Sequence, residues 1–437
     1  MAYFFIPDRV NYAIIIALTV SVFLAHSAYL FPDYCGFLSA FFLIPVFYAG
    51  FLIKKSAGWY GLYWGLLFFA VQLSWLIFTL PDYVKSPWHW IIYSILTIYF
   101  ALLAVIWFWL SVQLNCWAVG ACLYYYFLDH GACWFLGHWW GYPLSNVLLP
   151  LATYNTLIKP VGWLGIELYQ MLIIFFQMGI AFGIFTNNKK VLFIVIFATL
   201  ASITVSTWWC TKMPIVMPAI GCVMPVITAK KNAEQVAYEL TYALIAYADI
   251  HREVQILCAP ESAFPFIINE QQSAIALWQE NVPLNDKLFI LGAHIKEGDA
   301  VFNSLVGISE GHIVFTYHKR HLMPFIEYEQ AWATTIFTKR RNAFSAGKNE
   351  HEPVKHGSYQ LVPFICCEFF FEHQPPAGSQ EVPLLCLVND SHFLPYVGIL
   401  LLLYARLKAV AFERVVIYCS HRYGVIIQPD GTSALAR

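Results

Sequence analysis

The chain has 437 residues and a formal net charge of −1, and it is 59% hydrophobic, 18% aromatic and only 12% charged. An ordinary soluble domain is about 25% charged, so the composition excludes a wholly soluble globular protein and indicates a membrane protein. The near-neutral charge argues against a nucleic-acid partner. The 11 cysteines show neither CxxC spacing nor matching histidine pairs, which argues against a zinc site and a disulfide scaffold.

Long apolar runs fill the first half of the chain. Each is close to the ~20 residues that a helix needs to span a bilayer. The predicted spans are residues 11–31, 36–53, 58–80, 88–112, 115–130, 161–185 and 191–209. The fifth is the shortest and ends in the polar stretch "YYYFLDH". The small residues of "LAHSA" (24–28) after the first run also fit a cleaved signal peptide.

Lysines give the expected orientation of these spans. The pairs Lys54–Lys55 and Lys189–Lys190 lie in two of the three loops that seven spans with a cytoplasmic N-terminus would place inside. Cytoplasmic loops are enriched in lysine and arginine. The pattern therefore predicts that the polar C-terminal half lies outside the cytoplasm, and it requires an odd number of spans.

The charge distribution divides the chain in two. Residues 1–210 hold 12 Asp, Glu, Lys and Arg, and residues 211–437 hold 39. In the second part, short β-type runs alternate with helical patterns at 233–250 and 397–412, which is typical of an α/β domain. The second helical run is apolar, but it is short for a span and contains Arg406 and Lys408. We therefore expect it to be a buried helix. The predicted strands are 287–295, 304–309, 312–318, 359–365, 382–388 and 414–420.

Three polar residues each close a strand-like run of this domain: Glu261, Lys319 and Cys366. The ends of strands are where α/β folds present reactive groups. A carboxylate can take the proton of a thiol, and a lysine can stabilise a thiolate and a developing oxyanion. Together these residue types suffice for acyl transfer through a cysteine thioester.

Four motifs resemble the nitrilase superfamily in order, and the membrane half narrows the resemblance to the apolipoprotein N-acyltransferase family. The motifs are "PESAFP" (260–265), "YHKRHLMPFIEY" (317–328), "ICCE" (365–368) and "VND" (388–390), with "GYPL" (141–144) and "PVGWLGIEL" (160–168) similar in the membrane half. The resemblance implies about seven membrane helices over residues 1–210. It also implies an extracytoplasmic nitrilase-like αββα sandwich over residues 211–437.

The resemblance also assigns site residues. It implies that Glu261 is the general base, Lys319 the catalytic cation and Cys366 the nucleophile, with Glu327 partnering the lysine. Cys367 and Glu368 complete the nucleophile motif in a supporting role.

The activity implied is transfer of an acyl chain from phospholipid to the N-terminal amino group of diacylglyceryl-cysteine apolipoproteins. The resemblance places this activity at the periplasmic face of the bacterial inner membrane, among membrane lipids, without a metal or cofactor.

The chain departs from the family pattern at four places. Cys367 replaces a tyrosine, His392 in "NDSHFL" (389–394) replaces a tryptophan, and "HRYG" (421–424) stands where the family has Asn-Asn-Gly. A last transmembrane helix common in the family has no counterpart. Two alternatives therefore stay open: a membrane-tethered amidase or nitrilase-type hydrolase, and a non-catalytic component of a conjugation or secretion assembly.

Overall fold

The chain divides into two units, Met1–Thr211 with Leu394–Leu407, and Lys212–Phe393 with Lys408–Arg437. The computed structural model describes residues 12–114, 116–130, 146–209, 215, 219–223, 233–271, 287–310, 312–323, 327, 344–348, 352–371 and 382–436. The "GYPL" motif, residues 210–214 at the predicted domain boundary, and residues 324–326 and 328 of the lysine motif lie outside these ranges.

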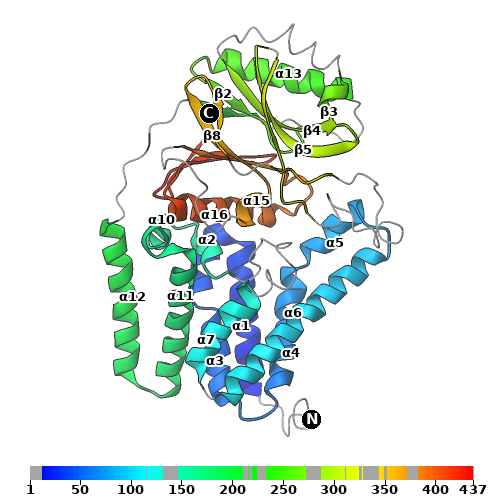
Figure 1. The fold of residues 1–437 in the computed structure, drawn as a ribbon. Helices are drawn as coiled ribbons and strands as arrows, with labels where there is room; N and C mark the ends of the chain where they lie inside the picture. The colour runs from blue at the N-terminus through cyan, green and yellow to red at the C-terminus, as the bar shows by residue number, and fades with distance from the viewer. Residues whose placement is uncertain are drawn as a thin grey trace. The chain divides into compact units, whose positions relative to one another are not determined.

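The first unit is helical (Figure 1). In chain order its helices are α1 (Tyr12–Leu30), α2 (Pro32–Cys35), η2 (Gly36–Ala40), α3 (Leu43–Leu52), α4 (Ala57–Gln72), α5 (Trp75–Thr79), η3 (Leu80–Asp82), α6 (Trp88–Gln113), α7 (Trp117–Tyr124), η4 (Tyr125–His130), α9 (Leu148–Leu151), α10 (Asn155–Ile158), α11 (Val161–Phe185) and α12 (Lys189–Trp209). Much of the first half of the chain is therefore helical, as expected from its apolar runs.

Within the described residues, six helical segments are long and apolar enough to cross a membrane. They are Tyr12–Leu30, Pro32–Leu52, Ala57–Asp82, Trp88–Gln113, Val161–Phe185 and Pro395–Phe412. Five coincide with predicted spans. The predicted fifth span contains the shorter apolar helix Trp117–Leu128, and the seventh corresponds to α12.

The sixth of these segments is α16 (Pro395–Phe412), which we expected to be a buried helix. It has the length and composition of a span. However, 67% of its 18-residue apolar stretch is buried, against 44–50% in the other five segments. The predicted class, a polytopic helical domain followed by an α/β domain, is confirmed.

Two glycines let α4 and α6 pack closely. A Cβ on Gly61 would lie 2.9 Å from the carbonyl oxygen of Ala104, and one on Gly65 would lie 2.8 Å from the Cα of Ala101. Small residues four positions apart bring the backbones of membrane helices close enough for tight van der Waals contact. The sequence "GLYWG" in α4 therefore matches the small alanines of α6.

Two six-stranded sheets form the second unit. One has the order β1-β2-β4-β5-β6 with β3 paired to β4, and the other has the order β12-β11-β10-β9-β8-β7. The strands are β1 (Ile220–Cys222), β2 (Ile256–Cys258), β3 (Phe264–Ile267), β4 (Leu288–Glu297), β5 (Ala300–Ser309), β6 (His312–His318), β7 (Val354–His356), β8 (Tyr359–Ile365), β9 (Leu384–Val388), β10 (Val416–Ser420), β11 (Gly424–Ile427) and β12 (Ser433–Leu435).

Helices cross between parallel strands of these sheets. α13 (Ala233–Ile250) connects the parallel pair β1 and β2, and α16 connects the parallel pair β9 and β10. Apolar residues of α13 such as Leu240 and Leu244 pack in one core with Leu257 and Phe289 of the first sheet. Figure 1 shows α13 on the outer side of this sheet and the second sheet on its other side. Short helices η5 (Ile268–Glu270) and α15 (Glu368–Phe371) follow β3 and β8.

Candidate active site

Each of the three predicted catalytic residues lies just past the end of a strand, Lys319 and Cys366 directly after it and Glu261 three residues after it. Glu261 follows β2, Lys319 follows β6 and Cys366 follows β8. β2 pairs in parallel with β4, and β8 pairs in parallel with β9. Strands that run in the same direction end at one edge of a sheet, so the loops after β2 and β6 lie at a common edge of the first sheet, and the loop after β8 comes from the second sheet.

A tight turn sets the position of Glu261. Ser262, the next residue, has φ of 54°, in the left-handed region. The turn lies against Gly292 of β4, where a Cβ would stand 2.5 Å from both the Cα of Glu261 and the backbone nitrogen of Ser262. Only glycine leaves room for this approach. The glycine in "FILGAHI" therefore supports the site although it carries no chemistry.

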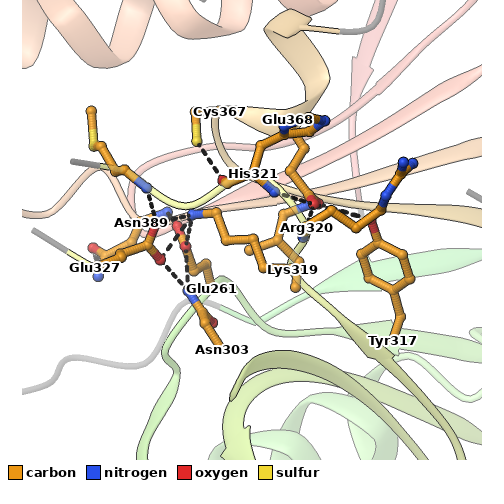
Figure 2. A network of polar contacts seen from close by, with 12 residues as sticks. Glu261, Asn303, Tyr317, Lys319, Arg320, His321, Glu327, Cys367, Glu368 and Asn389 are labelled. Carbon is orange, nitrogen blue, oxygen red and sulfur yellow. Dashed lines mark hydrogen bonds and ion pairs between the residues drawn. The ribbon is translucent and has the colours of Figure 1, made fainter. Parts of the chain in front are cut away.

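Lys319 lies between two carboxylates (Figure 2). Its Nζ is 2.9 Å from Oε1 of Glu261, and it is 2.8 Å from Oε2 and 3.0 Å from Oε1 of Glu327. The side chains of the three residues are between 1% and 8% exposed. Buried charges persist only when they are paired and hydrogen-bonded. The predicted lysine and both its carboxylates thus form one buried ionic cluster.

Asn303 of β5 joins the two carboxylates and was missed in the sequence analysis. Its Nδ2 donates to Oε1 of Glu261 at 2.9 Å and to Oε1 of Glu327 at 2.6 Å, as Figure 2 shows. It also accepts the Lys319 backbone N–H at its carbonyl, at 2.8 Å. The predicted strand 304–309 begins one residue after Asn303, whereas β5 begins at Ala300 and holds Asn303 at a buried position, where polar groups need hydrogen-bond partners.

Backbone N–H groups donate further hydrogen bonds to the carboxylates of Glu261 and Glu327. The N–H of Asn389, just after β9, donates to Oε2 of Glu261 at 2.8 Å. The N–H of Met323 donates to Oε2 of Glu327 at 2.8 Å. The "VND" motif therefore reaches the site through its main chain, and the carboxylate of Glu261 is held at both oxygens.

These contacts keep Glu261 ionised. Burial acts to raise the pKa of its carboxyl group, but the charge and hydrogen bond of Lys319 act against it. The hydrogen bonds from the Asn389 N–H and from Asn303 add to this, and the resulting pKa of Glu261 is below its ordinary value. A buried carboxylate that is charged at neutral pH can accept a proton during a reaction.

The lysine stays positively charged because, as at Glu261, neighbouring opposite charges outweigh the effect of burial. Burial acts to lower the pKa of Lys319. The negative charges of the Glu261 and Glu327 carboxylates outweigh burial and raise the pKa well above its usual value. Lys319 is thus a fixed cation that can stabilise negative charge on a reacting oxygen.

Cys366 occupies a strained turn at the end of β8. Its φ is 52°, its backbone N–H donates to the Leu387 carbonyl at 2.7 Å, and the residue is 6% exposed. A hydrogen bond with Cys367 and burial raise the pKa of the Cys366 thiol well above its ordinary value, with Glu261 adding to them and Lys319 opposing. The thiol is therefore neutral at rest and needs a base to become nucleophilic.

Glu368 ties the lysine loop to the cysteine turn. Its carboxylate accepts the backbone N–H groups of Arg320, His321 at 3.3 Å and Ile365 at 2.9 Å, together with the Tyr317 hydroxyl at 3.1 Å (Figure 2). Burial raises the pKa of Glu368 to about 7, against the N–H groups that lower it. This buried side chain therefore joins the main chain after Lys319 to the main chain just before Cys366.

Cys367 and the "HRYG" stretch, two of the departures from the family pattern, also contact the site. The Cys367 Sγ donates to the His321 carbonyl at 3.3 Å. The Nε2 of His421 is 3.1 Å from the backbone carbonyl oxygen of Glu261. His392 is exposed in the loop after β9. Among the described residues, no group of three or more His, Cys, Asp or Glu could hold a metal ion.

The chain is similar to known apolipoprotein N-acyltransferases. It is 23% identical over 377 residues to the enzyme of Vibrio vulnificus, covering 79% of this chain and 72% of that one. It is 31% identical over 157 residues to the enzyme of Bradyrhizobium diazoefficiens, covering 32% of this chain and 29% of that one. These similarities confirm the resemblance predicted from the motifs. No family model matches the chain.

Solved structures of carbon-nitrogen hydrolases are also similar to part of the chain. The hydrolase of Helicobacter pylori G27 has a TM-score of 0.38 and 12% identity, covering 50% of this chain and 85% of that chain. A carbon-nitrogen hydrolase superfamily protein of Xanthomonas campestris has a TM-score of 0.38 and 13% identity, again covering 50% and 85%.

Proposed function

We propose that the protein is a bacterial inner-membrane N-acyltransferase. It moves a fatty acyl chain from phospholipid to the N-terminal amino group of a diacylglyceryl-cysteine apolipoprotein. The observation that carries this proposal is the buried cluster of Lys319 with Glu261 and Glu327, next to the strained turn of Cys366. Similarity to enzymes of that name along 79% of the chain and the membrane-capable helices support it.

The first half-reaction makes a thioester. Glu261 takes the proton of the Cys366 thiol, and the thiolate attacks the ester carbonyl of a phospholipid. Lys319 and the backbone N–H of Cys367 stabilise the oxyanion. When the tetrahedral intermediate collapses, the leaving alkoxide receives the proton from Glu261 and departs as a lysophospholipid. The acyl chain remains on Cys366.

The second half-reaction makes an amide. The neutral amine of the apolipoprotein attacks the thioester, and Lys319 again faces the oxyanion. Glu261 removes a proton from the nitrogen and returns it to the departing Cys366 thiolate, which restores the resting site. No metal or organic cofactor enters either step.

A membrane domain suits these substrates. Phospholipid and diacylated apolipoprotein are both held in the bilayer, so a site at its surface meets them by lateral diffusion. We propose that residues 1–210 anchor the enzyme and that residues 211–437 form a catalytic domain on the periplasmic side. The lysine pairs Lys54–Lys55 and Lys189–Lys190 support this orientation through the positive-inside rule.

Intact mass measurement tests the thioester. Purified protein incubated with phospholipid is expected to gain the mass of one acyl chain, in a form that hydroxylamine removes. Cys366→Ala is expected to abolish the gain, and Cys367→Ala, one residue away, is the matched control that keeps it. Acylation that persists in Cys366→Ala and disappears in Cys367→Ala would show that the nucleophile is Cys367 and not Cys366.

Adding acceptor separates the alternatives. An acyltransferase passes the chain to a diacylated lipopeptide, whereas a hydrolase releases free fatty acid at the same rate with or without the lipopeptide. A protein that never gains acyl mass with any phospholipid would refute catalysis and leave the assembly-component alternative. Rescue of a bacterium depleted of its own enzyme would test the same activity in cells.

A further inference from the structure

In the proposed function, on which this inference rests, each turnover releases one proton more than Glu261 can carry. At neutral pH an α-amino group is mostly an ammonium ion, because its pKa is about 7.7–8.0. The ammonium must lose one proton before it can attack and a second when the amide forms. Glu261 returns the second proton to the Cys366 thiolate. The first proton needs another acceptor.

His421 is a basic group that touches the main chain of Glu261. It follows β10 directly, and its side chain is half-buried. Its Nε2 lies 3.1 Å from the Glu261 carbonyl oxygen. Because a carbonyl oxygen only accepts hydrogen bonds, Nε2 carries a hydrogen and Nδ1 holds the lone pair. The ring can therefore take a proton at Nδ1 and keep its bond to Glu261.

The groups that face His421 suit a base that is neutral at rest. Burial lowers the pKa of the His421 imidazole, and the nearby His392 adds to this. The bond to the Glu261 carbonyl and the charges of Asp390 and Glu261 oppose it. The ring is thus uncharged at neutral pH, with two acidic groups near enough to stabilise it once it is protonated.

Asp390 is placed to support such a charge. It is fully buried, and its Oδ2 accepts a hydrogen bond from Ser420 Oγ at 2.9 Å. Its other oxygen, Oδ1, has no hydrogen-bond partner among the residues that the structure describes. A buried carboxylate oxygen without a donor is unusual. Arg422 already offsets part of the Asp390 charge, and a transient positive charge on the neighbouring His421 would add to this.

We propose that His421 is the second base of the acyl transfer, and that its Nδ1 takes the proton of the incoming α-ammonium group. The N–H bond of the ammonium breaks, an N–H bond forms at Nδ1, and the neutral amine attacks the Cys366 thioester. The imidazolium then gives its proton to water, which accounts for the net proton released in each turnover.

His421→Gln removes the base and keeps the hydrogen bond. The glutamine Nε2 stands close to the position of the histidine Nε2 and can donate to the Glu261 carbonyl, but an amide has no basic nitrogen. About a tenth of an α-amino group is neutral at pH 7. The variant is therefore expected to transfer the acyl chain up to about tenfold more slowly at pH 7. The difference should vanish above about pH 9, where the amine is neutral in solution.

The experiment uses full-length acyl-enzyme prepared with phospholipid and then mixed with diacylated lipopeptide, with loss of acyl mass followed in time. His312→Gln, at the exposed start of β6, is the matched control and is expected to behave as wild type. A second acceptor, whose amine has an electron-withdrawing neighbour and is already neutral at pH 7, is expected to react at equal rates with wild type and His421→Gln.

The outcomes separate this inference from the proposed function. If wild type forms no acyl-enzyme, the proposed function fails. If His421→Gln acylates normally and transfers at the wild-type rate at pH 7, the second base is refuted. A rate that is lowered equally at all pH values and with both acceptors would also refute it, because it would show that His421 only positions Glu261.

Discussion

Replacing Glu327 with glutamine tests whether Lys319 needs both of its carboxylates. The lysine Nζ lies 2.8 Å from Glu327 and 2.9 Å from Glu261, inside a cluster that is almost fully buried. Glutamine has nearly the same shape and can still accept a hydrogen bond from Lys319 and Asn303. If the glutamine oxygen takes the place of Oε1, its amide nitrogen takes the place of Oε2 and cannot accept the Met323 N–H, so the substitution removes one charge and one backbone hydrogen bond.

The distances give the size of the effect on stability. At 2.8 Å and an effective dielectric constant of ~20, the Coulomb attraction of the lost pair is about 6 kcal/mol. The substitution also removes the cost of keeping a carboxylate out of water, which is several kcal/mol and offsets part of the lost attraction. We expect a net decrease of about 2 kcal/mol in the free energy of unfolding of the catalytic domain. Glu270→Gln, which removes the exposed pair with Lys296, is the matched control and is expected to leave the unfolding temperature unchanged.

The effect on rate follows from the position of the ammonium group. Without Glu327, one carboxylate and its shared asparagine hold the lysine, and we expect acyl-enzyme formation to slow by roughly 10²-fold, as for loss of an oxyanion stabiliser. Removing a carboxylate lowers the pKa of Lys319 from its raised value, but Glu261 still pairs with it and keeps it charged at neutral pH. The ratio of rates should therefore stay constant from about pH 6 to about pH 8.

Rapid-quench mixing with phospholipid, followed by intact mass measurement, gives this rate for wild type and both variants. A Glu327→Gln rate equal to wild type would show that Glu327 does not hold the lysine. A loss that recovers as the pH falls would show that the lysine had lost its proton, and that Glu261 alone does not keep it charged.

Three further predictions concern the membrane orientation of the chain, the turn at Glu261 and the pH dependence of stability. A periplasm-active reporter should be active when fused after the last residue and silent after Lys190, and the reverse would overturn the predicted orientation. Gly292→Ala, which puts a Cβ 2.5 Å from the Cα of Glu261, should slow acylation by roughly 10²-fold in the same assay, and a normal rate would mean that the turn can move freely. The pKa of Glu368 is about 7 in the folded state, above the unfolded value of about 4.3, so wild type should lose stability as pH rises between these values. Glu368→Gln should flatten that dependence in thermal unfolding, and equal slopes would contradict the raised pKa.

Local patterns in the chain were enough to predict much of this molecule. Long apolar runs predicted span-length helices because a bilayer sets the length of a helix that crosses it. Alternation of short strands and helices predicted the α/β unit, and strands such as 312–318 and 359–365 match β6 and β8. Glu261, Lys319 and Cys366 stood out because each closes an apolar run, and the resemblance of the surrounding motifs to a known family assigned their roles.

The remaining parts of the site depend on contacts between residues distant in sequence. Asn303 binds Glu261 across 42 positions, and His421 reaches the Glu261 carbonyl across 160. Such pairs arise only when strands from different parts of the chain are brought side by side, and no local periodicity encodes them. The glycine at 292 is likewise an ordinary strand residue until a turn from another segment packs on it. The sequence could therefore supply the reactive groups, whereas packing of the two sheets determined which groups hold them, and their charges, in place.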